Sequence, residues 1–201
     1  MTGHQLVLAT RNRKKLAELR RILEPVVGLD VLGLDDLPPF DEAPESGATF
    51  AENALAKARD AAEATGLAAV ADDSGLTVDA LNGMPGVLSA RWAGRHGNDL
   101  ANLELLLAQI VDVPDERRGA AFVCTAGLVL PGGAEHVLEA EMRGRIIRRP
   151  RGSGGFGYDP IFIADGHAMT TAEMTPEDKD AISHRGKAFR ALLPLLDADL
   201  G

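Results

Sequence analysis

Two adjacent carboxylates, Asp72 and Asp73, are the groups in this chain best suited to chemistry. They follow an apolar run at residues 67–71, which we expect to form a strand that ends at the pair, where ligands bind in open α/β sheets. Carboxylate oxygens suit a divalent cation, and the glycine of the following Ser74-Gly75 lets the backbone approach a phosphate. Adjacent side chains of an extended segment point to opposite sides, so one of the two, not both, should face a given metal. The spacing does not decide which one.

Two later segments carry groups that a nucleotide can use. Residues 153–160, Ser-Gly-Gly-Phe-Gly-Tyr-Asp-Pro, place Phe156 and Tyr158 beside glycines, which suits either base stacking or core packing. His184 and Arg185, at the expected start of the last helix, can bind a base or a phosphate, or can form an ordinary surface pair. Together with the acidic pair, these segments indicate an enzyme that acts on a phosphorylated nucleotide.

The turn at residues 10–15 is a candidate phosphate site. It lies where the first expected strand meets the first expected helix, and a helix N-terminus attracts anions through its unpaired N–H groups and its dipole. We expect Thr10 and Asn12 to add side-chain donors and Lys15 to add a cation. The glycines of a P-loop are missing, and a capped helix with a solvated basic turn is the alternative.

Another carboxylate and another lysine come from the segment before the acidic pair. Glu45 is the last acidic residue of the loop at residues 35–47 and stands just before Ser46-Gly47. Glu52 is expected to be the capping-box partner at the start of the next helix. Asn53 and Lys57 are four residues apart and therefore share a face of that helix. For Glu45 and Lys57, simple solvation is the alternative to a role in binding.

The composition limits the classes of partner and compartment. A formal net charge of −9 on 201 residues argues against non-specific binding of nucleic acid, which needs a basic surface. The single cysteine, Cys124, lies in an apolar run, so we expect it to be buried; it cannot form an internal disulfide, which fits the reducing cytoplasm. We expect no signal peptide, no membrane span and no membrane partner.

The hydrophobic periodicity predicts an α/β fold with a mixed sheet and one domain, residues 1–201, which can divide into two lobes. Strands are expected at residues 5–10, 29–34, 67–71, 120–130, 135–146 and 160–164. Helices are expected at residues 13–24, from the capping box at Thr49 to 65, at 98–111, from Pro176, and through the C-terminal segment. Pro25 is expected to end the first helix.

Taken together, these segments resemble the inosine triphosphate pyrophosphatase family, the Ham1-like proteins. The resemblance runs from Leu6 to about Leu195. It rests on six motifs in order: Thr10-x-Asn12-x-x-Lys15, Glu45-Ser-Gly-x-Thr49-Phe50-x-Glu52-Asn53-Ala54, Ala71-Asp72-Asp73-Ser74-Gly75-Leu76, Pro85-Gly86-x-x-Ser89-Ala90-Arg91, Gly155-Phe156-Gly157-Tyr158-Asp159-Pro160 and Lys179-x-x-x-Ser183-His184-Arg185-Gly186. Arg11 departs from the glycine of many members and adds a positive charge beside the expected phosphate site.

This resemblance implies an elongated mixed β-sheet with flanking helices, two lobes with an active-site cleft between them, and a homodimer. It implies that ITP, dITP and XTP are hydrolysed to the monophosphate and pyrophosphate with Mg²⁺, which cleanses the nucleotide pool. Asp73 matches the proton acceptor and a metal ligand, and Glu45 matches the second metal ligand. The residues that match substrate contacts are Thr10, Arg11, Asn12, Arg13, Lys14, Lys15, Lys57, Ser74, Phe156, Gly157, Tyr158, Asp159, Lys179, His184 and Arg185.

Two other functions remain open from the residues alone. A Maf-like nucleotide pyrophosphatase would act on pyrimidine or modified nucleotides, and the motifs at residues 155–160 and 183–186 favour the inosine family over it. A nucleotide-binding sensor without catalysis is the second alternative, and the presence of both Glu45 and Asp73 speaks against it.

Overall fold

The computed structural model describes residues 4–23, 29–41 and 44–200. Its contacts divide the chain into two compact units. The first unit comprises Met1–Asp73, Cys124–Ala140 and Arg185–Gly201, and the second comprises Ser74–Val123 and Glu141–His184. The chain therefore passes between the units several times, which is why no boundary is visible in the sequence. That the units are two lobes of one domain remains a prediction.

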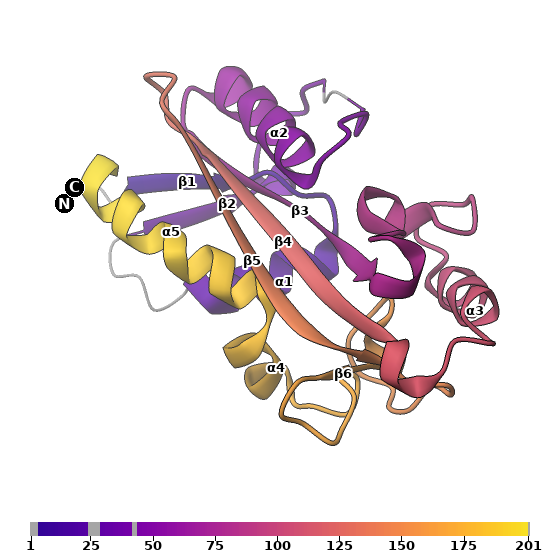
Figure 1. The fold of residues 1–201 in the computed structure, drawn as a ribbon. Coiled ribbons are helices and arrows are strands. Elements are labelled where there is room, and N and C mark those ends of the chain that lie inside the picture. Colours follow the sequence, from indigo (N-terminus) through magenta and orange to yellow (C-terminus); the bar gives the residue numbers. More distant parts are fainter. Residues whose placement is uncertain (1–3, 24–28, 42–43, 201) are drawn as a thin grey trace. The chain divides into compact units, whose positions relative to one another are not determined.

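Six strands form one sheet in the order β2-β1-β3-β4-β5-β6 (Figure 1). They are β1 (His4–Leu8), β2 (Leu29–Gly33), β3 (Ala68–Val78), β4 (Gly119–Val129), β5 (Glu135–Ile146) and β6 (Phe162–Ala164). β1 pairs in parallel with β2 and β3, whereas β5 pairs antiparallel with β6. The predicted α/β class with a mixed sheet is thus confirmed.

Five α-helices flank these strands in the described chain: α1 (Arg13–Leu23), α2 (Phe50–Thr65), α3 (Asp99–Gln109), α4 (Pro176–Ile182) and α5 (His184–Leu200). Each lies where the periodicity predicted a helix. Pro25, expected to end α1, lies outside the described residues. None of the helices in the described ranges is long and apolar enough to cross a membrane.

The capping box of α2 differs from the expected one in its return bond. The Thr49 hydroxyl accepts the backbone N–H of Glu52 at 3.2 Å, as predicted. The Glu52 carboxylate, however, accepts the N–H of Ala48 at 2.6 Å, one residue before the cap. The helix ends at Gly66, whose φ of 69° is the left-handed conformation that glycine adopts most readily.

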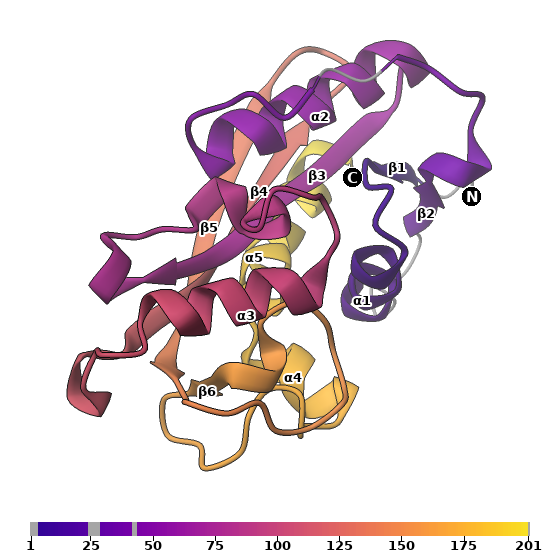
Figure 2. The ribbon, with the colours of Figure 1, turned by 90° about the vertical axis from the view of Figure 1, so that its right-hand side faces the viewer.

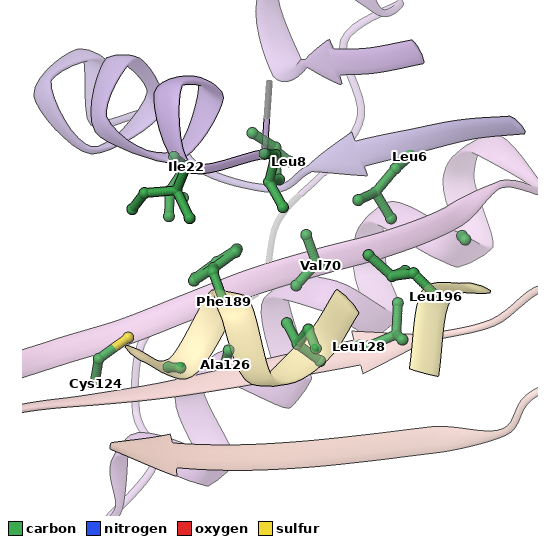
Figure 3. Close-up of a cluster of buried hydrophobic side chains, with 14 residues drawn as sticks. Leu6, Leu8, Ile22, Val70, Cys124, Ala126, Leu128, Phe189 and Leu196 are labelled. Atoms are coloured by element: carbon green, nitrogen blue, oxygen red, sulfur yellow. The ribbon is translucent and has the colours of Figure 1, made fainter. Parts of the chain in front are cut away.

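The first unit buries apolar residues on both faces of its strands. Leu6 and Leu8 of β1 pack with α1 and α5, and Figure 3 shows them with Ile22 and Phe189. Val7, which lies between them on β1, packs with the alanines of α2 on the other face. This alternation is the period of a strand, and it explains why β1 reads as a continuous apolar run. Cys124 is fully buried in the first of these clusters, as predicted.

The second unit has a core of its own, and Figure 2 displays its helices α3 and α4 together with β6. Leu103, Leu106 and Ile110 belong to this core, and Leu107 packs against it partly buried. Tyr158 also belongs to it. Each unit therefore has apolar packing of its own.

Candidate active site

The acidic pair lies inside a strand and not at its end, which corrects our expectation. β3 continues from Ala68 to Val78, and both Asp72 and Asp73 are buried, with relative exposures of 1% and 7%. The strand that does end near them is β1, because its register with β3 stops at the pair Leu8↔Val70. The carboxylates thus lie just beyond the carboxyl end of a neighbouring parallel strand, where α/β proteins place ligands.

Asp73 faces helix α2. Its Oδ2 accepts a hydrogen bond from Asn53 Nδ2 at 3.0 Å, and its Oδ1 lies 3.8 Å from Lys57 Nζ. The two α2 residues are one helical turn apart, so they reach the same carboxylate, as their shared face predicted. The Lys57 ammonium also donates to Glu45 Oε1 at 2.9 Å and to the backbone carbonyl of Asp72 at 2.7 Å. Solvation of Lys57, the alternative considered from the sequence, is therefore wrong.

For both Asp73 and Lys57, burial and the neighbouring opposite charges shift the pKa in opposite directions. Burial is the largest influence on Asp73 and raises its pKa above the ordinary value, although the charges of Lys57 and Lys15 act in the opposite direction. For Lys57, burial lowers the pKa of the ammonium, but the carboxylates of Asp72, Asp73 and Glu45 together outweigh it and raise the pKa. Lys57 is thus held as a cation between two carboxylates.

The loop that carries Glu45 is fixed to α2 by close backbone contact. Gly47 N donates to Asn53 Oδ1 at 2.8 Å, while the amide group of the same Asn53 binds Asp73. A Cβ atom at Gly47 would lie 2.7 Å from that amide oxygen, so no larger residue fits without a shift. Asn53 therefore links the loop to the strand. Its spacing from Lys57 was the sequence signal for this role, but we did not include it among the predicted site residues.

Asp72 points to other partners and carries a buried ion-pair chain. Its Oδ2 accepts from Lys15 Nζ at 2.9 Å and lies 3.3 Å from Arg185 Nε. Arg185 Nη1 in turn donates to Glu18 Oε2 at 2.7 Å. The side chains of Arg185 and Glu18 are each 5% exposed. The two aspartates thus use different sets of partners, as adjacent residues of a strand should.

This chain of charges was not visible in the sequence. Burial lowers the pKa of the Arg185 guanidinium, but the carboxylates of Glu18 and Asp72 outweigh it and raise the pKa. Arg185 and His184 are 4% and 3% exposed, so the alternative of a surface pair is wrong. Glu18 lies one turn after Lys15 on α1, but nothing in the sequence links it to a residue 167 positions away.

The turn before α1 is a capped helix start. Asn12 Oδ1 accepts the backbone N–H groups of Lys14 and Lys15 at 3.0 and 3.2 Å, and Thr10 Oγ1 accepts the N–H of Asn12 at 3.2 Å. Both side chains therefore act as acceptors toward the backbone, whereas we expected them to be donors. Arg11, Arg13 and Lys14 remain exposed on this turn.

In the second unit, Asp159 is a buried anchor with a relative exposure of 2%. Its Oδ2 accepts from Lys179 Nζ at 2.7 Å and from the backbone N–H of Phe156 at 2.8 Å, and its Oδ1 accepts from Thr171 Oγ1 at 2.8 Å. Lys179 Nζ also lies 5.3 Å from the centroid of the Phe156 ring, within cation–π range. No motif in the sequence marks Thr171.

The two aromatic residues of this loop have different environments. Tyr158 is 4% exposed, and its hydroxyl donates to the backbone carbonyl of Ser89 at 2.9 Å. Burial raises its pKa, and the charge of Asp99 adds to the effect. Phe156 is half-buried. Core packing is thus the environment of Tyr158, whereas Phe156 is partly exposed and has Lys179 over its ring.

His184 packs by stacking in the second unit. The centroid of its ring lies 5.1 Å from the centroid of the Phe122 ring, with an interplanar angle of 11°. Ser74, the remaining predicted contact, is half-buried on β3 directly after the acidic pair.

The residues around Asp73 fit a magnesium ion by their chemistry. No group of three or more His, Cys, Asp or Glu side chains that could hold a metal occurs among residues 4–23, 29–41 and 44–200. Mg²⁺, however, commonly uses one or two carboxylates together with phosphate oxygens and water. Glu45 and Asp73 supply two carboxylates, and the Lys57 ammonium already lies between them, at 2.9 and 3.8 Å. The two carboxylates could hold Mg²⁺ once substrate phosphate oxygens add negative charge to balance both the metal and the Lys57 ammonium.

Comparison with known proteins agrees with the resemblance found in the motifs. The model of the Ham1 family matches residues 6–195. This chain belongs to the Ham1 family. A dITP/XTP pyrophosphatase of Nocardia farcinica is 66% identical over 200 residues, which cover 98% of this chain and 97% of that protein. A protein of the same name from Streptomyces coelicolor is 59% identical and covers 98% and 99%.

Solved structures of the family have the same fold. The crystal structure of a nucleoside-triphosphatase, a dITP/XTP pyrophosphatase, from Mycobacterium abscessus is 60% identical, with a TM-score of 0.78 over 94% of this chain and 99% of that chain. A HAM1 protein from Coxiella burnetii is 41% identical, with a TM-score of 0.86 over 97% and 99%. These matches favour the inosine family over the Maf-like alternative.

Proposed function

We propose that this protein hydrolyses dITP, XTP and ITP to the monophosphate and pyrophosphate. The observation that carries the proposal is the group of Glu45, Lys57 and Asp73, in a Ham1 chain that is 66% identical to a dITP/XTP pyrophosphatase over nearly its whole length. Two carboxylates beside a lysine suit a reaction at a phosphate anhydride, where negative charge must be neutralised and a water molecule must be oriented.

In the proposed reaction, a water oxygen forms a bond to the α-phosphorus and the bond to the bridging oxygen breaks, so that pyrophosphate leaves. Asp73 orients this water and accepts its proton, and the raised pKa of its buried carboxyl makes it a better acceptor than an exposed one. Mg²⁺, held by Glu45 and Asp73, would neutralise charge on the phosphate oxygens. Lys15 and Lys57 stabilise the leaving pyrophosphate, and the exposed cations of the turn at residues 10–15 bind its tail.

Base selection is assigned to the groups of residues 156–159, 179 and 184–185. Hypoxanthine and xanthine carry a 6-oxo group, whereas adenine carries an amino group there. Donors from His184 and Arg185 would pair with the oxo group and would be left without a partner by adenine. Arg185 already donates to Glu18 and Asp72. To bind the base, it must either use a remaining N–H group or give up one of these two bonds. Phe156 supplies the ring for stacking, and the cleft between two lobes is proposed as the place where one nucleotide reaches both groups.

The products test this proposal. The enzyme is incubated with dITP, ITP, XTP, GTP, ATP and dTTP, with and without Mg²⁺, and the products are identified. We expect monophosphate and pyrophosphate in equal amounts from the 6-oxo substrates, only with the metal. Stoichiometric orthophosphate without added pyrophosphatase would contradict the proposal and indicate a phosphatase. The proposed homodimer is tested by light scattering of the purified protein, and the proposed cytoplasmic location by cell fractionation.

A further inference from the structure

The loop at residues 155–158 is held at several points within the second unit. Asp159 binds the N–H of Phe156, and the Tyr158 hydroxyl binds the carbonyl of Ser89, so both ends of the loop are fixed. A third bond reaches its middle. Gly157 N donates to Asp99 Oδ2 at 3.0 Å, across 58 residues of sequence. Asp99 belongs to none of the motifs that suggested a function.

The backbone of this loop needs such a bond. Gly155 and Gly157, on either side of Phe156, have φ values of 69° and 62°, in the left-handed region that glycine adopts readily. A Cβ atom at Gly155 would collide with the carboxylate of Asp159. Glycine restricts its own backbone less than any other residue, so the position of the Phe156 ring depends on the bonds that hold the segment.

Helix α3 does not need Asp99 as its cap. Asn98 already fills that position, because its side chain accepts the N–H of Ala101 at 3.3 Å. A carboxylate in the first turn still interacts favourably with the helix dipole, so stabilising α3 is the simplest alternative role for Asp99. The bond to Gly157 goes beyond that role, since a charged acceptor makes one of the stronger hydrogen bonds available to a backbone N–H.

We propose that Asp99 is a positioning residue for substrate binding: its carboxylate fixes Gly157 and thereby places the Phe156 ring as the surface on which the purine stacks. The inference rests on the proposed function of the loop as the base-binding element. Asp99 acts through the loop and not on the reacting phosphate. It therefore affects the binding of the nucleotide and leaves the chemical step at Asp73 unchanged.

Three substitutions at Asp99 separate this role from helix stabilisation. Asp99→Ala removes the acceptor and the charge, whereas Asp99→Asn keeps an oxygen that can accept from Gly157. Asp99→Glu keeps the charge at the helix start but moves the carboxylate by one methylene, so it also serves if the alanine variant fails to fold. Asn98→Ala is the matched control, because it weakens the same end of α3 without touching the loop.

The measurement is the KM and kcat of each variant for dITP and XTP with Mg²⁺, together with calorimetric binding of dIMP. We expect Asp99→Ala and Asp99→Glu to raise KM about tenfold, the value of one charge-assisted hydrogen bond, with kcat within about twofold. Asp99→Asn should recover part of this loss, because its neutral oxygen still accepts from Gly157, and binding of dIMP should weaken in parallel with KM. Asn98→Ala should lower the melting temperature and leave KM unchanged.

An equal rise in KM for Asn98→Ala, or unchanged KM in both Asp99→Ala and Asp99→Glu, would overturn the inference. Phe156→Ala distinguishes this failure from failure of the proposed function. A raised KM in Phe156→Ala with normal KM in the Asp99 variants would reject Asp99 alone. Normal KM in Phe156→Ala would remove the loop from base binding, and the role of Asp99 would be rejected with it.

Discussion

The pair Lys57–Asp73 of the first unit and the pair Lys179–Asp159 of the second differ in the distance between the two charges. In the second unit, Lys179 Nζ lies 2.7 Å from Asp159 Oδ2, and the aspartate side chain is 3% exposed. In the first unit, Lys57 Nζ lies 3.8 Å from Asp73 Oδ1, and the aspartate side chain is 10% exposed. The second pair is a short charge-assisted hydrogen bond, whereas the first is an ion pair without a hydrogen bond between the two charges.

This difference separates a group that holds a shape from one that can change partners. Asp159 binds a lysine, a threonine and a backbone N–H, so it fixes the loop at residues 155–158. Lys57 contacts Glu45, Asp73 and a backbone carbonyl. Because it has several partners, its ammonium can bind a phosphate and still keep some of them. We therefore expect substitutions in the second pair to reduce stability first and those in the first pair to reduce turnover first.

The largest effect is expected for Asp159→Asn. It leaves the Lys179 ammonium, 8% exposed as a residue, without its counter-charge, and breaking such a buried pair costs about 3 kcal/mol of the free energy of unfolding. Urea unfolding followed by circular dichroism measures the loss. Glu177→Gln is the control, because Glu177 is an exposed residue in the first turn of α4, the helix that carries Lys179. It should change the free energy of unfolding little. Equal stability of the two variants would remove the distinction between the pairs.

Asp73→Asn should lower turnover of dITP by at least about 100-fold, about 2.7 kcal/mol in the barrier, while the fold stays intact. It removes the proposed base and a proposed metal ligand but keeps the side-chain volume. Steady-state kinetics and a thermal melt measure the two properties. If Asp73→Asn kept a nearly normal rate and a folded Asp72→Asn did not, the catalytic role would belong to Asp72.

Loss of His184 or Arg185 should change selectivity more than chemistry. If His184 and Arg185 bind the 6-oxo group as proposed, removing one buried partner costs about 1–3 kcal/mol. His184→Ala or Arg185→Ala should then lower the ratio of kcat/KM for ITP over ATP by about tenfold or more. The Mg²⁺ requirement should not change. An equal loss of rate on every nucleotide would show that these residues bind phosphate or stabilise the structure. For Arg185, the structural role would be its bonds to Glu18 and Asp72.

The smallest effect is expected for Thr171→Val. It removes the hydroxyl that donates to Asp159 Oδ1 at 2.8 Å and to the Asp159 carbonyl at 3.2 Å, while the two bonds to Oδ2 remain, so the loss of stability should be about 1 kcal/mol. Urea unfolding again provides the measurement. A loss as large as that of Asp159→Asn would show that the threonine bond, and not the lysine charge, holds the loop.

Local patterns in the sequence predicted most of the elements. The apolar runs and the capping box at Thr49 indicated where strands and helices begin, because these signals act within one turn of the chain. The same reasoning gave the shared face of Asn53 and Lys57. It failed for β3, since polar residues at 72–74 looked like a strand end although neighbouring strands keep the segment extended.

By itself, the sequence determined which residue types are available for chemistry and, through six ordered motifs, the family. The tertiary structure decided their partners. Arg185 meets Glu18 across 167 positions, and Asp99 meets Gly157 across 58. Such contacts depend on where the sheet brings distant segments together, and they leave no periodic trace in the chain. The assignment of Asp72 to an ion-pair chain and of Asp73 to the lysine and the candidate metal could be read only from side-chain directions on β3, because adjacent residues of a strand look alike in sequence and face opposite sides in space.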